Sequence, residues 1–327
     1  MVQPMSPLFF TPLIKRIVWG GRRLGDLLGK PIGPASDYAE SWEIVDHGAD
    51  QSVVEVGPLA GQTLGGLLRD YNAELLGRHA GQDRFPLLLK YLDCHRVLSV
   101  QVHPDDDYAR TMQEPDLGKT EAWYVVDAVP GSRIYAGLKP GVDRPTLAAA
   151  VRSGRTEDCL HSWQPQAGEC VFIPAGTVHA LGGGLVVAEI QQSSDTTFRL
   201  FDWNRVGDDG QPRTLHVDQA LDVTDFARGP VTAQSPRAAD DGTRELVACD
   251  RFVLREARLT PAESVRLGGD DTLRLLTVPH GAAVLETTDG PSYNLPLGRS
   301  VLLPAALSAV SVRADAPETI VLIAELP

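Results

Sequence analysis

Short apolar segments with alternating polar residues make up much of this chain, and Pro or Gly interrupts them at close intervals. Alternation with a period of two is typical of β-strands, and frequent turns between short strands are typical of an antiparallel barrel or sandwich. We therefore expect a mainly β protein. The segments that carry the pattern are VLSVQVH, EAWYVV, SRIYAGL, ECVFIPA, LVVAEI, TLRLLTV and SVLLPA.

Helical patterns are fewer and lie between these segments. Three stretches have apolar residues at the spacing of one helical face, namely Thr63–His79, Arg144–Arg152 and Leu215–Asp222. We expect these helices to be inserts around the β framework.

A change in composition divides the chain. Residues 228–243 are rich in Pro, Ala, Ser, Asp and Gly without an apolar period, which is typical of a linker. We expect a metal-binding domain with helical inserts over residues 1–227 and a second β domain over residues 244–327. His280 is the only histidine of the second part, which repeats none of the ligand pattern described below. We expect it to be a structural barrel without metal ligands.

The charge of the chain limits its partners. The formal net charge is −13, and no run of Lys and Arg offsets it, so we expect neither nucleic acid nor a membrane as partner. An anionic substrate would need a local basic cluster. No apolar run reaches about 18 residues and no secretory signal precedes Trp19, so we expect the cytoplasm. The four cysteines are widely spaced and are expected to be reduced.

Four potential metal ligands stand at spacings that strands can bring together. Gln101 and His103 are two residues apart in LSVQVHPDD, so both side chains leave the same face of a strand. Glu121 opens the segment EAWYVV, and His179 follows a Pro-Ala-Gly turn that would return its imidazole to the same place. Nitrogen and oxygen donors without thiolate suit zinc, or else manganese, iron or cobalt, and the sequence does not separate these ions.

Four segments in succession resemble the signature blocks of the type I mannose-6-phosphate isomerases in their short bacterial form. They are KYLDCHRVLSVQVHPDD, GKTEAWYVV, GECVFIPAGTVHALGGG and EIQQSSDTTFRLFDWNR. The resemblance extends from Leu8 to Val223 and, more weakly, to the C-terminus. It implies a cupin fold, that is, a jelly-roll β-barrel, one bound zinc ion and the interconversion of mannose 6-phosphate and fructose 6-phosphate.

The resemblance also assigns roles to individual residues. The metal ligands of the family fall on Gln101, His103, Glu121 and His179. Its catalytic residues fall on Arg199, Asp195 and Lys119, and its phosphate-binding residues on Lys90 and Ser99. Long-form relatives can carry a second lysine where this chain has Trp123, so their proton-transfer base cannot simply be copied.

Isomerisation through an enediol needs a group that stabilises negative oxygen and a base. Arg199 is a permanent cation with a fixed fork of donors, which suits an oxyanion or a phosphate and not proton removal. Lys119 could act as the base in its neutral amine form, or it could contact the phosphate or a hydroxyl as a cation. Asp195 could act in ring opening or could orient Arg199. Trp19 and Trp42 could line a sugar pocket or belong to the core.

Two other functions remain open from the sequence. The protein could be a cupin that binds a sugar phosphate without turnover, although the retention of Lys119, Asp195 and Arg199 argues against this. It could also be an oxygen-dependent metal cupin, which would require redox-active iron. The sequence leaves the oligomeric state, the physiological direction and the metal loaded in the cell open.

Overall fold

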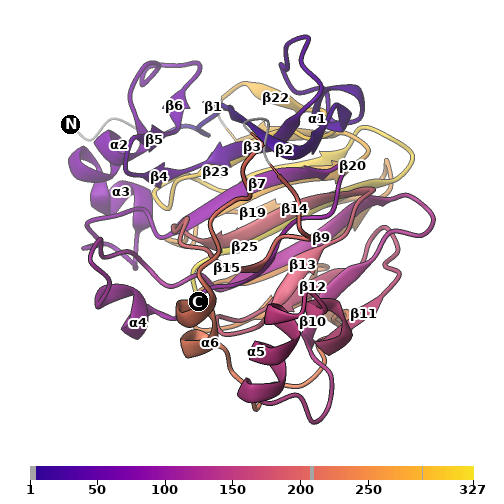
Figure 1. Cartoon of the computed structure of the whole chain (residues 1–327). Helices are drawn as coiled ribbons and strands as arrows, with labels where there is room; N and C mark the ends of the chain where they lie inside the picture. The colour runs from indigo at the N-terminus through magenta and orange to yellow at the C-terminus, as the bar shows by residue number, and fades with distance from the viewer. Residues whose placement is uncertain (1–4, 207–209, 289) are drawn as a thin grey trace.

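Antiparallel strands dominate the computed structural model, which describes residues 5–206, 210–288 and 290–327, and they form two stacked β-sandwiches (Figure 1). The first sandwich contains a five-stranded sheet in the order β11 (Leu160–Trp163), β10 (Ile134–Leu138), β13 (His179–Leu181), β8 (Val100–Val102) and β15 (Phe198–Phe201). Opposite it lies a six-stranded sheet in the order β12 (Cys170–Ile173), β9 (Glu121–Ala128), β14 (Leu185–Gln192), β7 (Leu87–Cys94), β3 (Tyr38–Ile44) and β2 (Leu13–Gly21).

The second sandwich also consists of two facing antiparallel sheets. Its six-stranded sheet has the order β16 (Arg237–Ala238), β17 (Arg244–Ala248), β18 (Val253–Leu259), β25 (Thr319–Glu325), β20 (Arg274–His280) and β23 (Ser300–Leu303). Its four-stranded sheet has the order β19 (Ser264–Leu267), β24 (Val310–Ala314), β21 (Ala283–Thr287) and β22 (Ser292–Leu295). Two short pairs complete the strands: β1 (Phe10–Thr11) with β6 (Val53–Val54), and β4 (Asp46–His47) with β5 (Asp50–Gln51).

Alternation along the strands builds separate apolar layers. On β14, Val186 and Ala188 point into a core between the two six-stranded sheets, whereas Leu185 and Val187 point into the first sandwich. A third core fills the second sandwich, and a fourth lies between the five-stranded sheet and helices α5 (Arg144–Arg152) and α6 (Val217–Val223). The six-stranded sheet of the first sandwich is therefore covered on both faces. This explains why LLLKYL and LVVAEI are almost continuously apolar.

The three predicted helices are confirmed with adjusted ends. Thr63–His79 contains two helices, α2 (Leu64–Asp70) and α3 (Asn72–Leu76), and Oγ1 of Thr63 caps α2 by accepting a hydrogen bond from the Gly66 amide at 3.1 Å. The remaining two predictions correspond to α5 (Arg144–Arg152) and α6 (Val217–Val223). The structure adds α1 (Arg23–Asp26), α4 (Asp106–Arg110) and the 3₁₀ turn η1 (Thr156–Cys159), which are too short to show an apolar period.

The mainly β fold is confirmed, and the expected barrel takes the form of facing open sheets. β2 ends one sheet of the first sandwich and β15 ends the other, and the described residues do not join them by a ladder. Ile17 and Trp19 of β2 line the same cavity as Thr197 and Arg199 at β15. The sheets therefore stay open where the cavity lies, as in a double-sheet jelly roll.

The predicted linker follows the surface of the first sandwich before it enters the second. The Val231 amide donates to Ala136 O at 3.1 Å, and the Gln234 amide donates to Cys170 O at 2.7 Å. The segment then forms β16, which pairs with β17. The division into residues 1–227, 228–243 and 244–327 stays a proposal.

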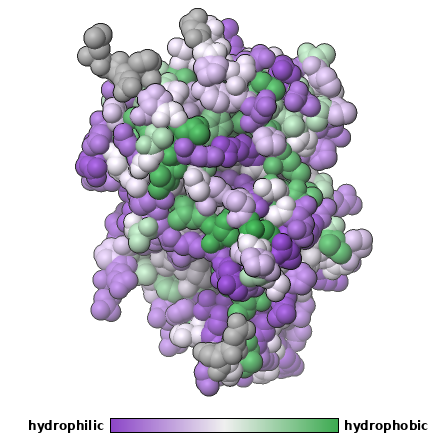
Figure 2. All heavy atoms as spheres, turned by 90° about the horizontal axis from the view of Figure 1, so that it is seen from above, coloured by the Kyte–Doolittle hydropathy of each residue, from purple (hydrophilic) through white to green (hydrophobic). Residues whose placement is uncertain are grey.

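Hydrophilic residues cover much of the face seen from above, and hydrophobic residues form separate groups among them (Figure 2). Within the described ranges, the large hydrophobic residues that stay exposed are Val53, Val56, Val129, Val206 and Leu215. None of the described helices is both long and apolar enough to span a membrane.

Candidate active site

A cavity of about 380 Å³ opens between the two sheets of the first sandwich. Charged and polar side chains from both sheets line it, together with a few apolar ones. Strand alternation explains this lining, because the residues that point into the cavity occupy the positions that form the core elsewhere on the same strands. On β7, Lys90 continues the inward row of Leu92 and Cys94, and on β14, Glu189 continues the row of Leu185 and Val187.

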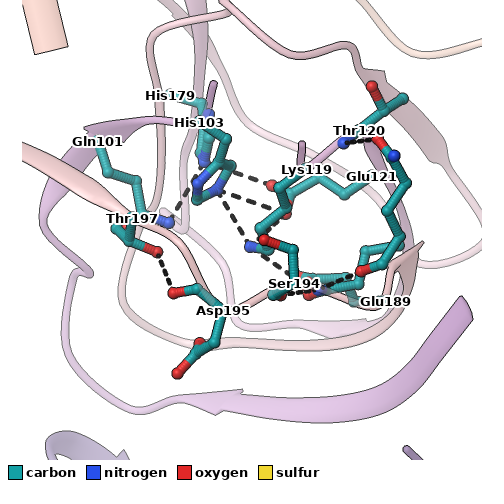
Figure 3. Close-up of polar contacts among 12 residues, drawn as sticks. Gln101, His103, Lys119, Thr120, Glu121, His179, Glu189, Ser194, Asp195 and Thr197 are labelled. Atoms are coloured by element: carbon teal, nitrogen blue, oxygen red, sulfur yellow. Dashed lines mark hydrogen bonds and ion pairs between the residues drawn. The ribbon is translucent and has the colours of Figure 1, made fainter. Parts of the chain in front are cut away.

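Two histidines and a glutamate meet at this cavity (Figure 3). Nε2 of His103 lies 3.5 Å from Oε2 of Glu121, and Nε2 of His179 lies 3.3 Å from Oε1 of the same carboxylate. Nδ1 of each ring lies 2.9 Å from a backbone carbonyl, Thr196 O for His103 and Thr177 O for His179. These carbonyls accept the Nδ1 proton, so both Nε2 atoms are left as acceptors that face the glutamate.

Burial keeps both imidazoles neutral. It lowers the pKa of His103 well below its ordinary value, and the positive charge of Lys119 adds to the effect. It also lowers the pKa of His179 to about 4. Neutral imidazole is the form that binds a metal ion, so both rings are in the ligand form at neutral pH.

The chemistry of this cluster fits a divalent cation. Glu121 is 1% exposed, and Oε1 of its carboxylate has no hydrogen-bond partner among the described residues. An unpartnered buried carboxylate oxygen is costly unless a cation meets it. The amide of Gln101 reaches the same point, with Nε2 placed 3.3 Å from Nε2 of His179. Exchange of the amide oxygen and nitrogen would turn a fourth donor toward the cluster.

The backbone brings the ligand segments together. Register pairs His179 with Gln101 across β13 and β8. Gly176, in the Pro-Ala-Gly turn before β13, has φ +84° and donates its amide to His103 O at 2.9 Å. A side chain would strain this conformation, which glycine adopts freely. The strand that follows this turn carries His179, which lies with His103 and Glu121 in the cluster.

Two lysines and three carboxylates form a buried charge network beside the cluster. Nζ of Lys119 lies 2.6 Å from Oε2 of Glu121, 3.1 Å from Nε2 of His103 and 3.7 Å from Oε1 of Glu189. Nζ of Lys90 lies 3.2 Å from Glu40 and 3.3 Å from Glu189. Burial alone would lower the pKa of Lys90, but these two carboxylates outweigh it and raise the pKa above its ordinary value.

Glu40 and Glu189 are site residues that the sequence reasoning missed. Glu189 stands directly opposite Lys90 in the β14–β7 register, and burial, followed by the charge of Glu121, raises its pKa. For Glu189 the available signal was a single charged residue in each of the apolar segments LLLKYL and LVVAEI, because such charges stay buried only when paired. The strand of Glu40, YAESWEI, also carries Glu43 and gave no such signal.

Trp19 and Trp42 have different places at the site. Trp19 lines the cavity, whereas Trp42 donates its indole N–H to Oε2 of Glu40 at 2.6 Å. Trp123, two residues after Glu121, donates its N–H to Oε2 of Glu189 at 3.0 Å and packs edge-on against His179. The indole groups of Trp42 and Trp123 therefore position the carboxylates of Glu40 and Glu189, which are ion-paired with the two lysines.

The five-stranded sheet supplies the outer wall of the cavity. Arg199 on β15 is directly opposite Gln101 on β8, and its Nη1 donates to Thr214 O at 2.8 Å. Asp195 lies at the rim and is exposed, and Oγ of Ser99 donates to Oε1 of Gln101 at 3.3 Å. The nine residues singled out from the sequence thus all lie at this cavity or in the adjoining cluster.

Comparisons with known proteins agree with this arrangement. Residues 8–122 match the catalytic domain of type I phosphomannose isomerases. The chain is 40% identical to a mannose-6-phosphate isomerase of Streptococcus mutans over 306 residues, which cover 93% of this chain and 94% of the relative. It is 36% identical to a mannose-6-phosphate isomerase of Bacillus subtilis over 263 residues, which cover 80% of this chain and 82% of that relative.

Solved structures give the same result. The crystal structure of the mannose 6-phosphate isomerase from Bacillus subtilis superimposes with a TM-score of 0.88 and 31% identity over 98% of this chain and 99% of that one. A phosphomannose isomerase from Salmonella typhimurium shares the fold at 16% identity, with a TM-score of 0.78 over 99% of this chain and all of that one. The chain belongs to the type I phosphomannose isomerase family.

Proposed function

We propose that this protein interconverts mannose 6-phosphate and fructose 6-phosphate with the help of one divalent metal ion. The observation that carries the proposal is the buried group of His103, Glu121 and His179 at a cavity lined by charged side chains, in a member of this family. Gln101 would complete four nitrogen and oxygen donors, which suit zinc. When bound, such an ion polarises a carbonyl or hydroxyl oxygen as a Lewis acid. A phosphorylated sugar as substrate favours the cytoplasm.

The chain itself supplies the charge that stabilises the reaction. The guanidinium of Arg199 stays cationic and faces the cavity, so it would meet negative charge that develops on the substrate oxygens. Asp195 lies four residues earlier at the rim, where it would act in ring opening or orient Arg199. Ser99 and Lys90, to which the resemblance assigns the phosphate, line the same cavity, and the two carboxylates paired with Lys90 weaken its attraction for an anion.

A proton must also move between C2 and C1 of the sugar. Lys119 and Glu189 face the cavity together, 3.7 Å apart, and indole groups fix their surroundings. The raised pKa of Glu189 means that its carboxyl holds a proton more readily than an exposed glutamate does. We propose that this pair takes the proton from C2 and returns it to C1.

Metal removal tests the proposed function. Chelation should abolish formation of fructose 6-phosphate in a coupled assay, and added zinc should restore it. Since each ligand histidine supplies one of few donors, His103→Ala and His179→Ala should lose bound metal, measured by atomic emission on folded protein. His161→Ala is the matched control, because that ring stacks on Trp163 away from the cluster. Stoichiometric zinc in a folded double variant of His103 and His179 would refute the assigned site.

A further inference from the structure

Three arginines gather around one carboxylate next to the cavity. Arg213, which lines the cavity, donates to Asp202 through Nε at 2.8 Å and through Nη2 at 2.6 Å. Arg205 donates to the same carboxylate and also to Val97 O, and Arg199 lies near enough for its charge to be felt by the group. In the part of the chain that the structure describes, Asp202 is the one carboxylate paired with Arg205 or Arg213. This side of the cavity therefore carries excess positive charge.

The six-stranded side of the cavity has a different charge balance. Its lysines, Lys90 and Lys119, are already ion-paired with Glu40, Glu189 and Glu121. A phosphate dianion near these lysines would also meet their carboxylates. Like charges repel strongly where water is scarce, so the arginine side is the more favourable place for the phosphate.

The order of residues on the arginine side suits an extended sugar phosphate. Arg199 is directly opposite Gln101, which adjoins the metal-binding cluster. Its Nη1 donates to Thr214 O, so Arg213 follows immediately along the wall. Nε of Arg199 is buried and has no hydrogen-bond partner within the described ranges. A ligand bound by its carbonyl end at the cluster would therefore pass Arg199 and present its other end to Arg213.

We propose that Arg213 binds the substrate phosphate, and that Asp202 is the positioning residue that holds the Arg213 fork. The inference rests on the proposed function for the identity of the sugar phosphate. Asp202 accepts two hydrogen bonds from one edge of the Arg213 guanidinium, which leaves Nη1 and the remaining Nη2 hydrogen for the ligand. A guanidinium fork matches phosphate oxygens better than an ammonium does. A lysine at position 213 should therefore retain only part of the affinity for the sugar phosphate.

Calorimetric binding of mannose 6-phosphate and of mannose to the zinc-loaded protein tests this inference without requiring turnover. Arg213→Ala should weaken binding of mannose 6-phosphate by about tenfold to a hundredfold, the usual effect of losing hydrogen bonds between charged groups. Binding of mannose should weaken much less, and Arg213→Lys should fall between wild type and Arg213→Ala. Arg144→Ala is the matched control, since that arginine pairs with Asp222 outside the cavity. Higher salt should weaken the wild type more than Arg213→Ala.

Two results would overturn the inference. One is equal weakening of both ligands in a folded Arg213→Ala protein, and the other is unchanged binding of mannose 6-phosphate. Failure of the proposed function would give a different result. A wild-type protein that binds mannose 6-phosphate but forms no fructose 6-phosphate would refute the isomerase function. The comparison of binding constants would still decide the role of Arg213.

Discussion

The guanidinium of Arg199 shows how one side chain can serve catalysis with little effect on folding. It is only partly buried, and one hydrogen bond to Thr214 O ties it to the wall. Arg199→Ala should lower turnover by roughly a hundredfold to a thousandfold, because a preorganised donor at developing negative charge contributes about 3 to 4 kcal/mol to the barrier. The melting temperature should change little. Near-normal turnover of the variant would contradict a catalytic role of Arg199 and would indicate a structural one.

Lys90 should behave in the opposite way, since its ammonium is buried between Glu40 and Glu189. Lys90→Met leaves both carboxylates without this cation and should lower the free energy of unfolding by about 3 to 5 kcal/mol, measured by urea denaturation. If Lys90 also contacts the phosphate, KM for mannose 6-phosphate should rise more than KM for mannose. Equal changes in both Michaelis constants would show that Lys90 only neutralises the buried carboxylates and does not contact the phosphate.

At the scale of elements, the turn between β14 and β15 is tied to the rest of the first sandwich through Asp116. This carboxylate accepts hydrogen bonds from Ser194 and Thr196, each at 3.0 Å, and Thr196 O accepts the Nδ1 proton of His103. His47 lies 3.2 Å from Asp116. Burial opposes the charge of Asp116, but hydrogen bonds, that of His47 first, hold its pKa well below the usual range.

This contact predicts a pH-dependent contribution to stability. The hydrogen bond with Asp116 raises the pKa of His47 above its ordinary 6.5, although burial opposes the shift. The stabilisation is therefore complete below the pKa of the unfolded chain and is lost as pH rises through the higher folded value. The difference in melting temperature between wild type and His47→Gln should be larger at about pH 6 than at about pH 9. A difference that grows with pH would contradict this assignment.

At the scale of the whole molecule, the core between the two sandwiches joins the halves of the chain. Leu89 and Tyr91 on β7 pack in one cluster with Leu254 and Leu322 of the second sandwich. The Tyr91 hydroxyl is hydrogen-bonded to Thr277 Oγ1 at 2.6 Å. The second sandwich therefore buries the outer face of the sheet that carries Lys90, Glu121 and Glu189.

A fragment of residues 1–227 tests the proposed division of the chain. Removal of the second sandwich exposes a broad apolar face on β7, β9 and β14, and such faces associate in water. We expect the fragment to be aggregated or partly unfolded in size-exclusion chromatography and circular dichroism, whereas the whole chain unfolds in one transition. A monomeric, folded fragment that binds zinc would instead show that the first part is an independent domain.

The sequence by itself determined the class of fold and the metal-binding candidates. Period-two alternation marks strands locally, and two side chains on one strand, such as Gln101 and His103, must share a face whatever the rest of the chain does. Helices α2, α5 and α6 were predictable for the same reason, because their apolar spacing is a local property.

Only the tertiary structure decided which strands meet and how their charges balance. Glu40 and Glu189 lie far from Lys90 in the sequence, and strand pairing alone brings them around its ammonium. Arg213 lines the cavity and donates to Asp202, a contact that no periodic pattern encodes. A local pattern fixes the direction in which a side chain leaves its strand, whereas the electrostatic partners of that side chain depend on long-range packing. The same long-range packing leaves the two sheets of the first sandwich open where the cavity lies.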